Sequence, residues 1–230
     1  MKNETGSVGS KIGAALLTAS LGLGAAGGLG YYLHLDKVNA QNSVTATMVG
    51  MIDTPQGTMP HAELELAVYA DSESSGGVHG PDGGPFPGYV TYGPASHLIL
   101  PAHSLITITI KGYDGGESLN HSFFGRVIGT VDGTATMDGK PYTALGNHDV
   151  QHTWTLHGLP TSTQDPLFVN IPLGKQSDEA MDAFDATGEL PTPIITTFSF
   201  YTKGAGEYVW NCEFPCGDGT YQKFGAAMSK

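Results

Sequence analysis

Basic residues are scarce in this chain. Its 230 residues include 10 lysines and arginines against 22 aspartates and glutamates, so the net charge is −12. Such a chain would repel the phosphate backbone of a nucleic acid rather than neutralise it, and we therefore expect no nucleic-acid partner.

Several catalytic signatures are also absent. The sequence contains no G-x-S-x-G, H-E-x-x-H or G-x-x-x-x-G-K-[ST] pattern, which argues against α/β-hydrolase, zinc-protease and P-loop chemistry. The Gly-Gly and Gly-Asp-Gly pairs flank expected strands, not helices, so we interpret them as turns. The acidic residues are dispersed, and no carboxylate pair for acid–base catalysis can be recognised.

Glycine and proline are abundant instead. The chain has 33 glycines and 14 prolines, and only 14% of its residues are charged. This composition is typical of short strands joined by turns; it disfavours a helical bundle and excludes a long coiled coil. An apolar fraction of 40% in 230 residues suffices for one domain with a buried core.

Apolar and polar residues alternate with a period of two in many short runs, which is the pattern of half-buried strands. The spacing of these runs predicts an all-β sandwich or barrel. The expected strands cover residues 44–51, 63–70, 97–101, 104–111, 123–131, 149–157, 166–171, 194–201 and 207–212.

One segment, residues 175–189, breaks this alternation. Ser177 is suited to be an N-cap, acidic residues follow in the first turn, and Gly188 is suited to end a helix. We therefore expect a short inserted helix. Its acidic face is either a solvated surface or a docking face for a basic partner.

The N-terminal residues 1–37 are predicted to be a signal anchor. Lys2 and Lys11 precede the uncharged run Ile12–Leu35, which is long enough to span a bilayer at ~1.5 Å per residue. The alternative is a signal peptide cleaved after Ala40. Both interpretations place the rest of the chain outside the cytoplasm, in the periplasm or at the cell surface.

The domain expected after the linker 38–43 covers residues 44–230. Its final strand is expected to be missing or to come from elsewhere, because no apolar run follows Met228.

The two cysteines, Cys212 and Cys216, lie at the end of an expected strand that enters a Gly/Pro-rich turn. Two thiols four residues apart can face one point in space. They could form a structural disulfide, which is common outside the cytoplasm, or bind copper as soft thiolates. On these residues alone both interpretations stay open.

A histidine lies within an alternating strand of the same region. His152, Trp154 and Leu156 share one face if the strand is regular. A histidine on an apolar face is either a hydrogen-bonded core residue or a ligand.

Four segments together resemble the cupredoxins, and within them the copper domain of cytochrome oxidase subunit II. Asp149–Trp154 (DVQHTW) is similar to the D-V-x-H-[ST]-[FW] strand that delivers the first copper histidine. Leu100–Ile110 resembles the preceding strand, and Gly204–Cys212 resembles the hairpin before the copper loop. Cys212–Gly217 resembles the C-x-x-x-C-G loop itself. The resemblance covers about residues 100–216, with a long insertion at 112–147.

The resemblance implies a Greek-key β-sandwich that holds one or two copper ions. The implied metal ligands are His152, Cys212, Cys216 and Met228. The implied function is electron transfer to or within a respiratory oxidase, with a cytochrome c or oxidase subunits as redox partner. In that role the protein is membrane-anchored and is not an enzyme by itself.

The chain also departs from the family. Thr220 and Lys223 stand where the family has a histidine and a methionine, and Met228 comes five residues later. A dinuclear centre would therefore need a second histidine from elsewhere. The candidates are His121, His148, His103 and His157.

Two alternative functions come from other classes. Copper-delivery proteins of oxidase assembly use the same set of metal ligands, one histidine with a C-x-x-x-C pair. The other alternative is a metal-free accessory subunit in which Cys212 and Cys216 form a disulfide.

Overall fold

The computed structural model describes residues 43–69, 91–116, 122–158 and 165–213, with residues 12–13, 17–18, 20 and 22–30 nearer the N-terminus. The chain divides into two compact units, Met1–Asn42 and Ser43–Lys230. Residues 22–30 of the first unit are helical. Within the described part of the chain, no helix is long and apolar enough to cross a membrane. The expected anchor, Ile12–Leu35, falls partly outside the described residues.

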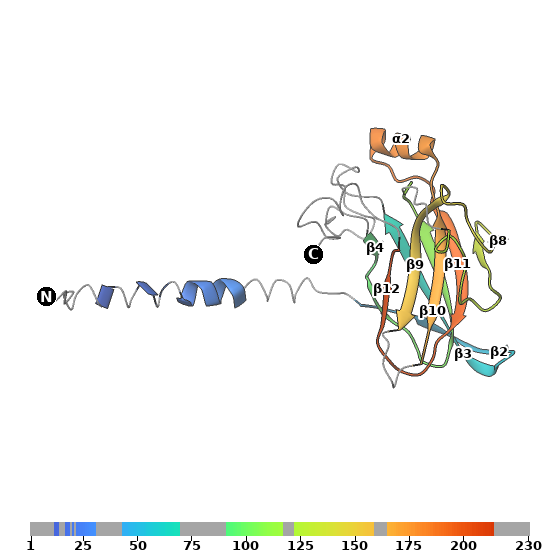
Figure 1. Cartoon of the computed structure of the whole chain (residues 1–230), viewed down its shortest axis with the longest axis horizontal. Helices are drawn as coiled ribbons and strands as arrows, with labels where there is room; N and C mark the ends of the chain where they lie inside the picture. The colour runs from blue at the N-terminus through green and yellow to red at the C-terminus, as the bar shows by residue number, and fades with distance from the viewer. Residues whose placement is uncertain are drawn as a thin grey trace. The chain divides into compact units, whose positions relative to one another are not determined.

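The second unit consists mainly of β-strands (Figure 1), which confirms the all-β class predicted from the alternation. The expected Greek-key connectivity stays a prediction. The elements in chain order are β1 (Ser43–Thr45), β2 (Thr47–Thr54), β3 (Gly57–Tyr69), β4 (Thr91–Gly93), β5 (His97–Ile99), β6 (Leu105–Gly112), β7 (Ala135–Met137), β8 (Lys140–Tyr142), β9 (Val150–Gly158), β10 (Phe168–Gly174), α2 (Asp178–Thr187), β11 (Ile194–Tyr201) and β12 (Tyr208–Asn211).

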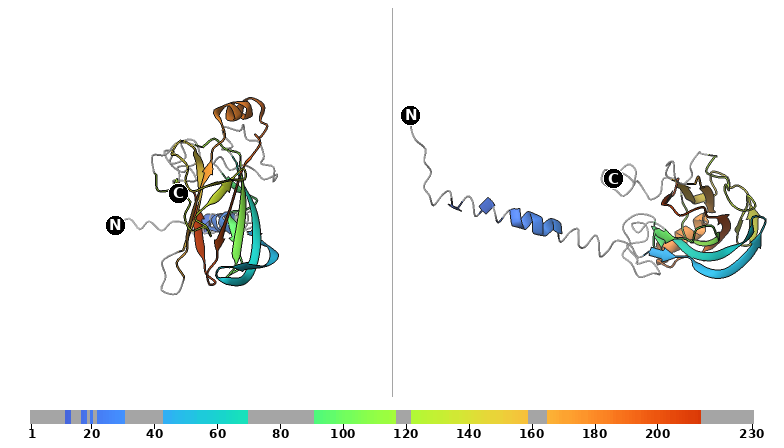
Figure 2. Two further views of the ribbon diagram at one scale, coloured as in Figure 1. Left: turned by 90° about the vertical axis from the view of Figure 1, so that its right-hand side faces the viewer. Right: turned by 90° about the horizontal axis from the view of Figure 1, so that it is seen from below.

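The strands form two main sheets, seen from two further directions in Figure 2. The larger has the order β2-β3-β6-β11-β7-β8, with β4 also paired to β3. The smaller has the order β10-β9-β12, so β12 is an edge strand that pairs with β9. Strands β1 and β5 form a separate parallel pair.

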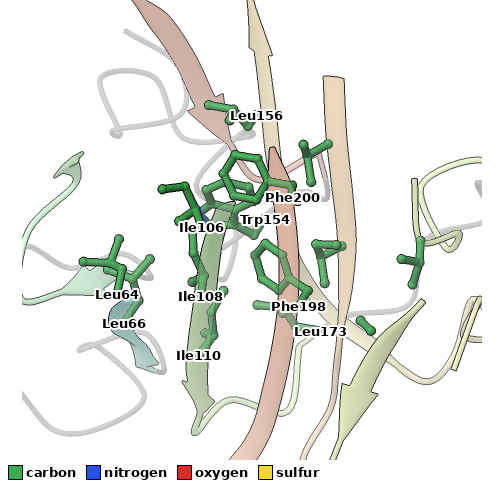
Figure 3. Close-up of a cluster of buried hydrophobic side chains, with 14 of the residues drawn as sticks. Leu64, Leu66, Ile106, Ile108, Ile110, Trp154, Leu156, Leu173, Phe198 and Phe200 are labelled. Atoms are coloured by element: carbon green, nitrogen blue, oxygen red, sulfur yellow. The ribbon is translucent and has the colours of Figure 1, made fainter. Parts of the chain in front are cut away.

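Apolar side chains from both sheets meet in one core (Figure 3). Along β6 the isoleucines at 106, 108 and 110 are buried, while the threonines between them are partly exposed. This is the period of two that predicted the strand. From the smaller sheet, Trp154 packs against Phe198 and Phe200 of β11, with ring centroids 5.2 and 5.7 Å apart.

The prediction of a strand over residues 123–131 is wrong. Only two isolated bridges occur there, Arg126 with Ala144 and Ile128 with Asn170. The segment instead lies beside β10 with one antiparallel bridge, in which Ile128 and Asn170 exchange backbone hydrogen bonds. The Asn170 side chain also donates to the carbonyls of Phe124 and Arg126. At Gly129 (φ 79°) a Cβ would lie 2.1 Å from the Phe168 carbonyl oxygen, so this close approach requires glycine.

The short inserted helix is confirmed as α2. The Ser177 side chain accepts a hydrogen bond from the Ala180 N–H, as an N-cap does. Gly188 ends the helix in the left-handed conformation, and its N–H donates to the Phe184 carbonyl. Phe184 is buried, while the acidic residues on the other side are exposed.

We expect Phe200→Ala to lower the free energy of unfolding by about 3–5 kcal/mol, because the side chain is fully buried and its loss leaves a cavity. The matched control is Phe123→Ala, at a side chain that is 44% exposed, which should cost far less. Urea denaturation of both variants provides the measurement. Equal losses would contradict the core assignment.

Candidate metal centre

The imidazole of His152 lies near the start of β9 and is almost completely buried, with 1% of the residue exposed. Its Nε2 is 2.7 Å from Oδ2 of Asp114, two residues beyond β6. The backbone of Asp114 is held on both sides: its N–H donates to the Gln151 side chain and its carbonyl accepts from the Gln176 N–H. The carboxylate is therefore fixed against one edge of the imidazole.

A tight glycine turn follows Asp114. The backbone N–H groups of Gly115 and Gly116 form hydrogen bonds with the Asp114 carboxylate. Gly116 has φ 63°, and a Cβ there would lie 2.2 Å from the Cα of Gln151. Only glycine fits this close approach, so the turn forms where the sequence provides two glycines after the aspartate.

On its other edge the imidazole faces Cys212, the residue directly after β12. The Cys212 Sγ is 3.8 Å from Nδ1 of His152. The backbone N–H of Thr153 points at the same sulfur, with an N···S distance of 3.3 Å. The chain beyond the cysteine is held as well, because the Glu213 N–H donates to the Thr153 hydroxyl at 2.8 Å.

The electrostatics of the three groups are coupled. Burial alone would lower the pKa of His152, but the hydrogen bonds and negative charges of Asp114 and Cys212 outweigh it and raise that pKa to about 9. Burial alone would raise the pKa of Asp114, but its bonds from His152 and the two glycine N–H groups lower it below the ordinary value. In the absence of a metal, His152 is therefore an imidazolium at neutral pH.

Two of the four predicted ligands are thus neighbours, His152 and Cys212. Cys216 and Met228 lie outside the described residues. Among the residues that the structure describes, no group of three or more His, Cys, Asp or Glu side chains is arranged to hold a metal ion.

The histidines considered as a second ligand are spread over the domain. His157 follows His152 by five residues, so it points to the other face of β9, where it bonds to Asn211 at 3.1 Å. His103 lies beside Gly204, near the opposite end of β9. His148 is exposed, and His121 is not among the described residues.

The donor pair can be tested against the bond lengths of a soft metal ion. An ion about 2.0 Å from nitrogen and about 2.3 Å from sulfur can bridge atoms up to about 4.3 Å apart. The observed 3.8 Å satisfies this limit. A carboxylate on the other ring nitrogen of a ligating histidine is a common feature of metal sites, and Asp114 occupies that position. The distance between these two donors is therefore compatible with a soft ion bound to both.

Comparison of the chain with protein-family models, with curated proteins and with solved structures gave no match. The assignment of the centre consequently depends on the residues themselves.

The sequence analysis did not find Asp114 or Thr153 as parts of this centre. Asp114 precedes His152 by 38 residues, and the segment between them has no recognisable ligand spacing. The only local signal is the Asp-Gly-Gly turn directly after a strand. Thr153 contributes through its backbone N–H, which any residue except proline supplies, and through its hydroxyl, which accepts a hydrogen bond from the Glu213 N–H.

We expect the stability of the reduced, metal-free protein to fall as the pH rises from 6.5 through 9. A histidine whose folded pKa lies above its unfolded value of 6.5 stabilises the fold fully below 6.5 and loses this contribution as the pH passes its folded pKa of about 9. The loss should be roughly 3 kcal/mol at most. Urea denaturation at several pH values measures it.

The variant Asp114→Asn removes the main stabilising partner of the imidazolium and should flatten this pH dependence. Glu65→Gln, on the outer face of the larger sheet, is the matched control and should leave the slope unchanged. An equally steep slope in Asp114→Asn would contradict the pairing.

Proposed function

We propose that this protein is a copper-binding electron-transfer protein with a cupredoxin-type Greek-key sandwich, acting with or within a respiratory oxidase. The observation that carries the proposal is the 3.8 Å approach of His152 Nδ1 to Cys212 Sγ. Imidazole and thiolate are ligands of copper and also of zinc. Between the two metals, the resemblance of both segments to the copper strand and copper loop of oxidase subunit II supports copper.

His152 and Cys212 would hold the copper, with Cys216 and Met228 as the remaining ligands. Bound copper supplies reversible one-electron chemistry. Asp114 is hydrogen-bonded to Nε2 of His152, so Nδ1 is the ring nitrogen available to a metal. Because His152 has a raised pKa, it must give up a proton when a metal binds, and uptake should release protons.

The surroundings of these side chains favour electron transfer over exchange of the metal. His152 sits in a strand whose residues 150–156 are all buried, and Thr153 and Glu213 fix the main chain next to Cys212. Ligands held this firmly keep their geometry when the charge of a bound metal changes.

We test the proposal by titrating the reduced full-length chain with copper and recording visible and near-infrared spectra. Intense sulfur-to-copper charge-transfer bands are expected. They should disappear in Cys212→Ser and His152→Gln and weaken in Asp114→Asn. His61→Gln is the matched control, because His61 bonds to Thr107 on the outer face of the larger sheet.

The other outcomes discriminate between the alternatives. A colourless, tight Cu(I) complex would contradict electron transfer and favour copper delivery. Absence of copper uptake would leave a metal-free accessory subunit with a Cys212–Cys216 disulfide.

The proposed location is the outer side of a membrane, with residues 1–37 as the anchor. The supporting observation is the uncharged run Ile12–Leu35 at the N-terminus. We expect the full chain to stay in the membrane fraction after a high-salt wash, because apolar burial does not depend on ionic strength. Recovery of a soluble chain that begins at Gln41 would contradict the anchor and support a cleaved signal peptide.

A further inference from the structure

A cavity of ≈ 650 Å³ lies between β5, the loop before β12, and β12 itself. Its volume is in the range of pockets that bind small organic molecules. Leu156, which lines it, follows His152 by four residues on β9, about 13 Å along the strand. The cavity is therefore separate from the metal centre.

The apolar part of the lining includes four leucines and a tryptophan: Leu98, Leu100, Leu156, Leu167 and Trp210. The Trp210 ring is held in place, because its Nε1 donates to the Ser96 carbonyl at 2.8 Å and Tyr92 packs edge-on against it at 4.9 Å between centroids. A fixed aromatic wall next to leucines favours a ligand with an apolar body.

Most polar side chains of the lining already have a partner within the protein. The hydroxyls of Thr202 and Tyr208 donate to backbone carbonyls, at 2.7 and 3.4 Å. His97 and Glu207 also take part in interactions with other groups of the chain. None of these four side chains needs a ligand to satisfy it, so none of them defines the charge of the ligand.

The two polar side chains that remain are Ser96 and Lys203, which have no partner among the residues that the structure describes. An ammonium has three N–H donors and no acceptor, and a hydroxyl can donate as well, so both suit an acceptor group in the ligand. Lys203 adds a positive charge, which favours an anionic acceptor, and a carboxylate forms charge-assisted hydrogen bonds with an ammonium. One cation matches a single negative charge.

We propose that the cavity binds a small monocarboxylic acid with an apolar body. The body packs against the leucines and Trp210, and the carboxylate pairs with Lys203, which is exposed. The site does not depend on the proposed copper function, since the proposed contacts do not involve His152 or Cys212.

The experiment compares three probes that share one apolar body and differ in charge. Phenylbutyrate carries a carboxylate, phenylbutanamide is neutral, and phenylbutylamine carries an ammonium. Binding to the full-length protein is measured by calorimetry. We expect the carboxylate to bind most tightly and the amine most weakly, with a difference of roughly two- to fivefold between the carboxylate and the amide. Acetate, which lacks the apolar body, should show no measurable binding.

Three variants test the assignment of the residues. Lys203→Gln should weaken the binding of phenylbutyrate by roughly two- to fivefold and change that of the amide far less, because it removes only the charge. Lys140→Gln, at an exposed lysine on β8, is the matched control and should change the affinity of none of the probes. His152→Gln should also leave all affinities unchanged, which separates this cavity from the metal centre.

Equal affinity for the carboxylate and the amide, or tightest binding of the amine, would overturn the monocarboxylate ligand. A preference for the carboxylate that survives in Lys203→Gln would overturn the role of Lys203. If none of the three probes binds, or if acetate binds as tightly as phenylbutyrate, the apolar binding site itself is overturned. The circular dichroism of each variant, compared with that of the unmodified chain, separates a lost site from a lost fold.

Discussion

The pairing of His152 with Asp114 is the contact on which the candidate centre depends. His152 belongs to β9 of the smaller sheet, whereas Asp114 follows β6 of the larger one. Their 2.7 Å contact therefore links the two sheets at one end of the sandwich. Moving either sheet along its strands would separate the pair, and the imidazole would lose the partner that fixes its orientation toward Cys212.

Joining two sheets through a buried ion pair costs free energy, because both charged groups lose their water. Removing an imidazolium and a carboxylate from water costs several kcal/mol per ion, and an apolar pair of similar size often stabilises a core equally well. The backbone N–H groups of Gly115 and Gly116 offset part of this cost, because they form hydrogen bonds with the Asp114 carboxylate. Such an arrangement is understandable if the orientation of His152 matters more than stability, as it does for a metal ligand with a fixed outer partner.

The sequence predicted those parts of the fold that depend on local periodicity. The alternation of isoleucine and threonine defines β6, and Ser177 and Gly188 mark both ends of α2. The segment at 123–131 alternates in the same way but forms only one bridge with β10, between Ile128 and Asn170, and its carbonyls at 124 and 126 bond to the Asn170 side chain instead. Hydrophobic periodicity indicates which side chains of a segment are buried. It does not indicate which strand the backbone of that segment pairs with.

The same distinction applies to the centre. His152 and Cys212 could be proposed from the sequence because each lies in a short motif. Asp114 could not, because its role comes from a contact between two sheets that no local pattern encodes. Long-range partners of this kind become visible only when the register between strands is known.

The register of β12 against β9 determines the geometry of the candidate centre. In β12 the side chain of Trp210 faces inward and stacks on Trp154 at 5.9 Å between centroids. Cys212 comes two residues later, so it follows on the same face. Slipping an edge strand by one residue would turn both side chains to the opposite face.

Two contacts oppose such a slip: Asn211 bonds to His157 on the outer face, and the Glu213 N–H bonds to the Thr153 hydroxyl. Among the described residues, β12 pairs with β9 alone and is only four residues long. These side-chain contacts therefore supply much of what holds the cysteine beside the histidine.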